Sequence, residues 1–118
     1  MLNMSKEQAE VLKDAIKTFG ERNQEDIAIE EMAELTKELI KNRRYGEDYN
    51  RLDIREEIVD VQIMLLQLIL IYGFDKDVFD RKIDRLNQRI TATKCEISQN
   101  IESCEDCGFC NSGGDNNA

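Results

Sequence analysis

Apolar residues recur at the three- and four-residue spacing of an α-helix through most of the chain, and polar capping signals divide it into segments. The first segment begins at Ser5, where Gln8 three residues later matches a capping box, and it ends near Gly20. A second segment covers about residues 23–44 and stops before Gly46. These signals predict two consecutive helices in the first part of the chain.

The later sequence predicts two more helices. The third segment begins at Asp53, with Glu56 three residues later as a second capping box, and it ends at Tyr72. The fourth begins at Asp75 and runs at least to Lys94. The chain contains no proline and no tryptophan, and glycine is rare before its last residues. We therefore expect an all-α fold built from four helices.

The apolar pattern differs between the two central segments. In the second segment Ala28, Met32, Leu35 and Leu39 form one stripe, which is typical of a helix with a single buried face. The third segment is apolar nearly all round over residues 58–71. A helix that is apolar on every side must be buried on every side, and four helices of one small chain cannot easily surround it. We therefore expect a second copy of the chain to complete the bundle.

Composition limits the classes of partner. The net charge is −9, from 25 acidic and 16 basic residues, which argues against nucleic acid as a partner. The apolar run over residues 58–71 is too short to span a bilayer and contains Asp60. No apolar targeting segment is recognisable at the N-terminus. We expect a cytoplasmic protein with no membrane partner, whose thiols stay reduced.

The charge distribution divides the chain into two regions. Residues 1–94 hold the four predicted helices and form a helical domain. Residues 95–118 contain five acidic and no basic residues, and they end in the polar stretch NSGGDNNA. We expect this second region to be a flexible, partly disordered tail.

Two acidic clusters stand on the central helices, EEMAE at residues 30–34 and EEIVD at residues 56–60. Residues three apart on a helix share a face, so Glu31 lies beside Glu34, and Glu57 lies beside Asp60. The loop around residues 45–52 can turn the chain back on itself. The four carboxylates can then converge on one place.

These acids could be solvated surface groups, as most helical glutamates are, but their neighbours argue otherwise. Only Glu34 has a basic residue at helical spacing, Lys37, and Asp60 lies within the apolar segment. A buried carboxylate without a partner is unfavourable by several kcal/mol, so a cation is expected. The ligands are all oxygens and the chain has no histidine, which favours Mg²⁺ or Mn²⁺ over Zn²⁺. The absence of histidine also excludes a ferritin-like di-iron site.

The motif pair E-E-x-x-E and E-x-x-D, separated by residues 35–56, resembles that of the MazG-like nucleoside triphosphate pyrophosphohydrolases. This all-α superfamily also includes dimeric dUTPases, and the resemblance covers about residues 24–90. It implies a MazG-like four-helix bundle, completed as a homodimer or homotetramer. It also implies Mg²⁺-dependent conversion of an NTP or dNTP to the NMP and pyrophosphate. By this resemblance Glu31, Glu34, Glu57 and Asp60 are the catalytic, metal-binding residues.

Basic residues are expected to hold the phosphates of such a substrate. Lys82 and Arg85 share a face of the fourth segment, although they can equally form a solvated stripe paired with nearby aspartates. Lys37, one turn after Glu34, is another candidate. Gln24 could read a base edge, or it is simply a polar residue of a first helical turn. Either Glu34 or Glu31 is the expected acceptor of the proton from the attacking water.

Four cysteines stand in the tail region. Cys104, Cys107 and Cys110 form C-x-x-C-x-x-C, and Cys95 is the fourth. This count suits a Cys₄ zinc site, less readily an iron–sulfur cluster, and free thiols are the alternative. The spacing differs from that of zinc ribbons and from the pyrophosphohydrolase pattern.

An alternative function remains open at this point. A non-catalytic helical dimer could bind metal or nucleotide in a regulatory role, and a plain structural bundle is a weaker possibility. All four metal-ligand positions of the motif pair carry a carboxylate, which favours the enzyme over these alternatives.

Overall fold

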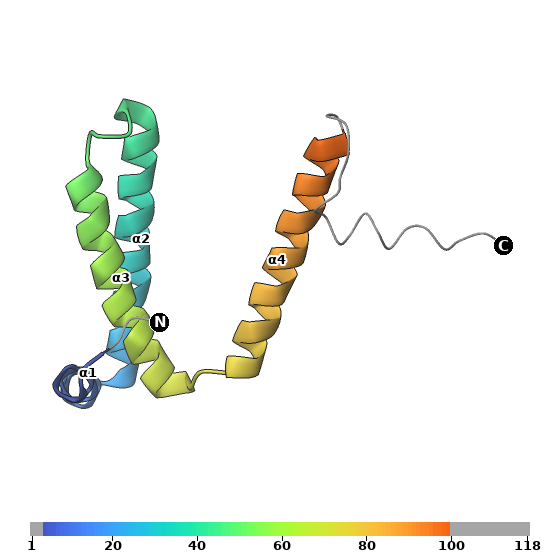
Figure 1. The fold of residues 1–118 in the computed structure, drawn as a ribbon. Helices are drawn as coiled ribbons and strands as arrows, with labels where there is room; N and C mark the ends of the chain where they lie inside the picture. Colours follow the sequence, from blue (N-terminus) through green and yellow to red (C-terminus); the bar gives the residue numbers. More distant parts are fainter. Residues whose placement is uncertain (1–3, 100–118) are drawn as a thin grey trace. The chain divides into compact units, whose positions relative to one another are not determined.

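A computed structural model describes residues 4–99, and these residues form four α-helices and no strand. They are α1 (Lys6–Phe19), α2 (Glu21–Tyr45), α3 (Arg51–Tyr72) and α4 (Lys76–Gln99) (Figure 1). The all-α prediction is confirmed for this part of the chain. The chain divides into two compact units, one that ends at Phe74 and one that begins at Asp75. The first unit holds α1 to α3, and the second holds α4.

The capping box predicted at the start of α1 is confirmed. The Ser5 hydroxyl accepts a bond from the Gln8 backbone N–H at 3.1 Å, and the Gln8 side chain accepts from the Ser5 N–H at 2.9 Å. The helix ends at Gly20, whose φ of 89° suits glycine because it has no Cβ. Gly20 is also the residue before α2, so α2 begins at Glu21, earlier than the predicted Asn23.

The third helix also begins earlier than predicted: the residue before it is Asn50 rather than Asp53, so Asp53 and Glu56 lie within the first turns of α3 and do not cap it. Asn50 takes the position before the helix, because its side chain is held by α2 through bonds described below. The predicted end of this helix at Tyr72 is confirmed. The predicted start of α4 is confirmed by Asp75, whose carboxylate accepts from the Val78 N–H at 3.0 Å.

The fourth helix extends past the expected limit of the helical domain. It continues beyond Lys94 to Gln99, so the first residues of the acidic segment are helical. Several of its apolar residues fall on one face at heptad spacing, and they are all exposed in this chain. They are Phe79, Ile83, Leu86, Ile90 and Ile97.

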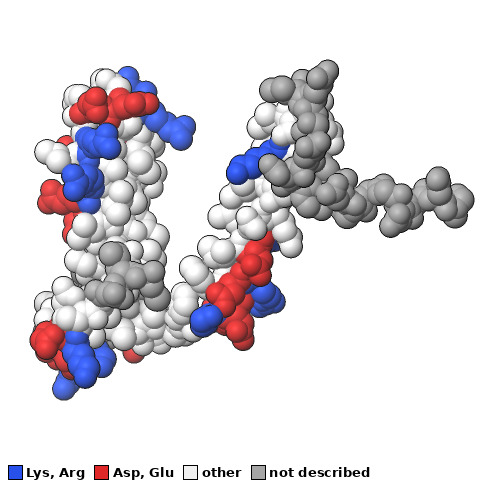
Figure 2. Space-filling view, viewed as in Figure 1, with Lys and Arg blue, Asp and Glu red and all other residues white. Residues whose placement is uncertain are grey.

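The core of the first unit lies where α1 packs against the start of α2 and the end of α3. Leu12, Ala28 and Met64 are its buried apolar residues. The expectation that α3 is buried all round is not met within one chain, because Val59 is 56% exposed and Ile58 is 51% exposed. In Figure 2 charged residues gather near the turn between α2 and α3, and the visible surface of these helices below them includes a large uncharged area.

None of the helices in the described residues is both long and apolar enough to cross a membrane.

Candidate metal centre

Three carboxylates from two helices meet between α2 and α3. These helices run antiparallel side by side, because only residues 46–50 separate them in the chain (Figure 1). Glu31 projects from α2, and Glu57 and Asp60 lie three residues apart on α3. One carboxylate oxygen from each lies within 4.8 Å of the others, and all three side chains are half-buried. Helical spacing thus brings together three of the four residues predicted from the sequence.

The electrostatics of this group favour a cation. The pKa of Glu57 is raised, first by burial and then by the negative charges of Asp60, Glu31 and Glu34. A proton on Glu57 relieves this repulsion, and a divalent cation would relieve it more fully. Three half-buried oxygen donors without sulfur or imidazole fit a hard ion such as Mg²⁺ or Mn²⁺.

The fourth predicted ligand, Glu34, lies outside the group. Its side chain is 49% exposed, and its carboxylate accepts a bond from the Lys37 ammonium at 3.1 Å. This ion pair also engages the lysine predicted to bind phosphate. Glu30 and Glu56, which helical geometry directs away from the cluster, are exposed.

The other predicted substrate-binding residues lie in different environments. Lys82 and Arg85 are exposed on α4, in the second unit. Gln24 lies in the first turn of α2, as one of its two interpretations expected, and it is only 4% exposed.

Sequence reasoning missed a buried polar network beside the carboxylates. Glu38 lies one turn after Glu34 on the same face of α2, and it is 8% exposed. Its carboxylate accepts a bond from Lys41 at 2.7 Å and another from Asn50 at 2.6 Å. The bonds from Lys41 and Asn50 lower the pKa of Glu38 despite its burial. The Glu38 bond likewise raises the pKa of Lys41.

Asn50 is the residue that joins this network to α3. Its amide nitrogen also donates to the Glu38 backbone carbonyl at 2.8 Å, and its oxygen accepts from Asn42 at 3.2 Å. The start of α3 is thereby fixed against α2. The spacing of Glu38 and Lys41 was a usable signal in the sequence, but nothing there marked Asn50 as their partner.

The predicted tail site falls mostly outside the described residues. Cys104, Cys107 and Cys110 lie beyond residue 99. Cys95 lies near the end of α4, where it is 4% exposed and its sulfur is in a disulfide bond, so the expectation that the thiols stay reduced is wrong for this residue. A cysteine binds zinc as its thiolate, so the zinc site predicted for these four cysteines requires a reduced Cys95.

Comparison of the chain with protein families, with curated proteins and with solved structures found no match.

Proposed function

We propose that this protein is a Mg²⁺-dependent nucleotide pyrophosphohydrolase of the MazG-like type, which converts an NTP or dNTP to the NMP and pyrophosphate. The observation that supports this proposal most is the meeting of Glu31, Glu57 and Asp60 within 4.8 Å between two antiparallel helices. These are three of the residues that the motif resemblance assigns to the metal. Oxygen donors in this number leave further positions on the ion for phosphate oxygens.

Glu31, Glu57 and Asp60 would hold the cation, and the bound cation would give this negatively charged protein a local site for a polyphosphate. The bound ion would offset the negative charge of the triphosphate and polarise its phosphorus–oxygen bonds. Glu34 lies one turn from Glu31 at the edge of the site, with Lys37 beside it. In this proposal Glu34 accepts the proton from the water that attacks the α-phosphorus. The bond from the α-phosphorus to the bridging oxygen breaks, and pyrophosphate leaves.

The same proposal includes a homodimer or homotetramer. The apolar surfaces of α2 and α3, where Ile58 and Val59 are more than half exposed, support burial against another copy. Sedimentation of the purified protein tests this part, because a monomer at micromolar concentration would contradict it.

Metal binding can be tested with two pairs of variants, one at carboxylates of the group and one at the exposed carboxylates next to them in the sequence. Glu31→Gln and Glu57→Gln each remove a carboxylate of the group, whereas Glu30→Gln and Glu56→Gln remove exposed carboxylates at adjacent positions. All four changes alter the net charge equally. Mn²⁺ binding, followed by electron paramagnetic resonance, should weaken at least tenfold in the first pair and stay within twofold in the second.

The outcomes separate the two functions considered for this chain. Pyrophosphate release that follows the same pattern as metal binding supports the enzyme. Metal and nucleotide binding without any turnover would instead favour a regulatory binding module. Equal effects in both pairs would remove the assignment of the metal site.

A further inference from the structure

Two buried carboxamides on α2 and α3 carry polar atoms that lack a partner. Gln24 and Gln67 are each 4% exposed. Within residues 4–99, neither the amide nitrogen of Gln24 nor the amide oxygen of Gln67 has a hydrogen-bond partner. The amide nitrogen of Gln67 reaches only the Met64 sulfur at 3.8 Å, which is a weak acceptor. Buried polar groups normally find partners, so these two require an explanation.

Both glutamines lie at a fixed interval from the carboxylates. Gln24 precedes Glu31 by seven residues, and Gln67 follows Asp60 by seven. Seven residues make almost two full turns of an α-helix, so each glutamine shares a face with its carboxylate. Because Glu31 and Asp60 meet across antiparallel helices, the two glutamines lie at the same level of the helix pair. That level is about 10 Å from the carboxylates along the helix axis.

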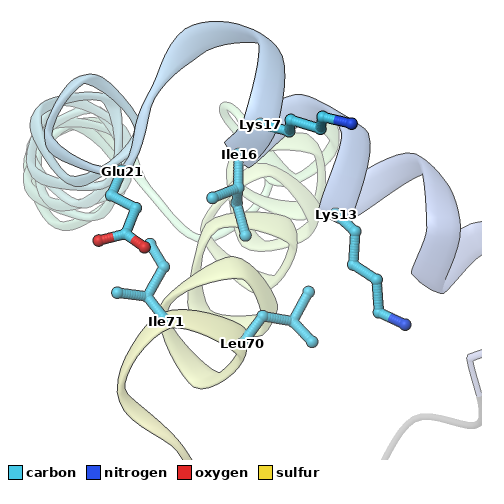
Figure 3. A pocket seen from close by; sticks show the side chains of 6 residues that line it. All are labelled: Lys13, Ile16, Lys17, Glu21, Leu70 and Ile71. Carbon is cyan, nitrogen blue, oxygen red and sulfur yellow. The ribbon is translucent and has the colours of Figure 1, made fainter.

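A hollow of about 250 Å³ lies one further turn along the same helices. Leu70 follows Gln67 by three residues and lines this hollow, and Glu21 lines it three residues before Gln24. Figure 3 shows Ile16, Leu70 and Ile71 directed toward one another, while the ammonium groups of Lys13 and Lys17 point away from them. An apolar lining with a few polar groups is typical of sites that bind small molecules.

We propose that Gln24 and Gln67 bind the base of a nucleotide whose phosphates lie at the carboxylates. Each nucleobase presents a donor and an acceptor side by side, and two carboxamides can satisfy both. The interval of about 10 Å matches the length of a nucleoside monophosphate from its phosphate to the far edge of its base. The inference rests on the proposed function, and it names the two residues that would distinguish a base-bearing triphosphate from an inorganic polyphosphate.

Methionine is the matched replacement, because it has nearly the shape of glutamine without the amide. In Gln24→Met and Gln67→Met the unpaired polar atoms disappear, so the protein should unfold at the same or a higher temperature than wild type. Gln62→Met, at a half-buried position of the same helix, serves as the control. The probes are the α,β-imido analogues of the four deoxynucleoside triphosphates, inorganic triphosphate and Mn²⁺ alone.

Calorimetry should show that the Gln24 and Gln67 variants lose affinity for at least one analogue by a factor of about ten or more. Their affinities for inorganic triphosphate and for Mn²⁺ should stay within twofold of wild type. The control Gln62→Met should bind the analogues, inorganic triphosphate and Mn²⁺ within twofold of wild type. Variants that bind all analogues like wild type would overturn the base-binding role and leave the proposed function standing. A wild-type protein that binds Mn²⁺ but no nucleotide analogue would overturn both.

Discussion

Replacing Asn50 with alanine should destabilise the protein through loss of the bonds that join α3 to α2. Two of these bonds have neutral partners, the Glu38 carbonyl at 2.8 Å and the Asn42 amide at 3.2 Å. At about 1 kcal/mol each, they give a loss of about 2 kcal/mol. The bond to the Glu38 carboxylate adds to this value, which is therefore a lower bound. For a domain of this size the melting temperature should fall by roughly 10 °C.

The assay is urea denaturation followed by circular dichroism, at a fixed protein concentration and with EDTA present. The exposed Asn23, also changed to alanine, is the matched control and should alter the free energy of unfolding by less than about 0.5 kcal/mol. Asn50 also fixes the start of α3, the helix that carries Glu57 and Asp60. The Asn50→Ala variant should therefore bind Mn²⁺ more weakly while it is still folded.

Two results would refute this reasoning. Unchanged stability in Asn50→Ala would show that the buried network does not join the helices. Lower stability with wild-type Mn²⁺ affinity would show that the network holds the fold without positioning the carboxylates. As a further check, Asn50→Asp should be less stable than Asn50→Ala at neutral pH, because it places a second carboxylate against Glu38.

Three further predictions concern titrating groups. The pKa of Glu57 is raised above its ordinary 4.5, so its contribution to the stability of the metal-free protein is present below that value and is lost as pH rises through the raised pKa. Denaturation in EDTA across this range should show the dependence in wild type but not in Glu57→Gln, and Mn²⁺ affinity should rise over the same range. The pKa of Glu38 is lowered, so its contribution is present above 4.5 and is lost as pH falls through the lowered pKa, a loss that Glu38→Gln should remove. The hydroxyl of Tyr72 donates to Glu25, which raises the pKa of the phenol, and ultraviolet titration of Glu25→Gln should show that pKa returning toward its ordinary value.

Helix positions in this chain could be predicted because they depend on local signals. The capping box at Ser5 and the stop at Tyr72 involve residues within a few positions of each other, and both predictions are confirmed. The residue before α3 was predicted three positions late, at Asp53 rather than Asn50, because Asn50 is fixed by a partner 12 residues earlier in the chain. A sequence pattern cannot show such a contact until the antiparallel register of α2 and α3 is known.

The candidate site could be predicted only in part for the same reason: spacing within one helix can be seen in the sequence, but contacts between helices cannot. Spacing within each helix paired Glu57 with Asp60, and the turn between the helices brought them to Glu31. The position of Glu34 depends on whether it binds a metal or the ammonium of Lys37, and sequence spacing allows both. The buried state of Gln24 and Gln67 could not be predicted, because it depends on contacts between helices that lie far apart in the sequence.

The measurement that tests the central claim most directly is product analysis with the natural NTPs and dNTPs. Each nucleotide is incubated with Mg²⁺ and either wild type, Asp60→Asn or the exposed-site control Glu56→Gln. A Mg²⁺-dependent pyrophosphohydrolase should release NMP and pyrophosphate in equal amounts from at least one nucleotide, with activity that EDTA removes. The Asp60→Asn variant should lose turnover while it remains folded, and Glu56→Gln should keep it. No hydrolysis of any nucleotide by folded wild type, or equal turnover by Asp60→Asn, would contradict the account.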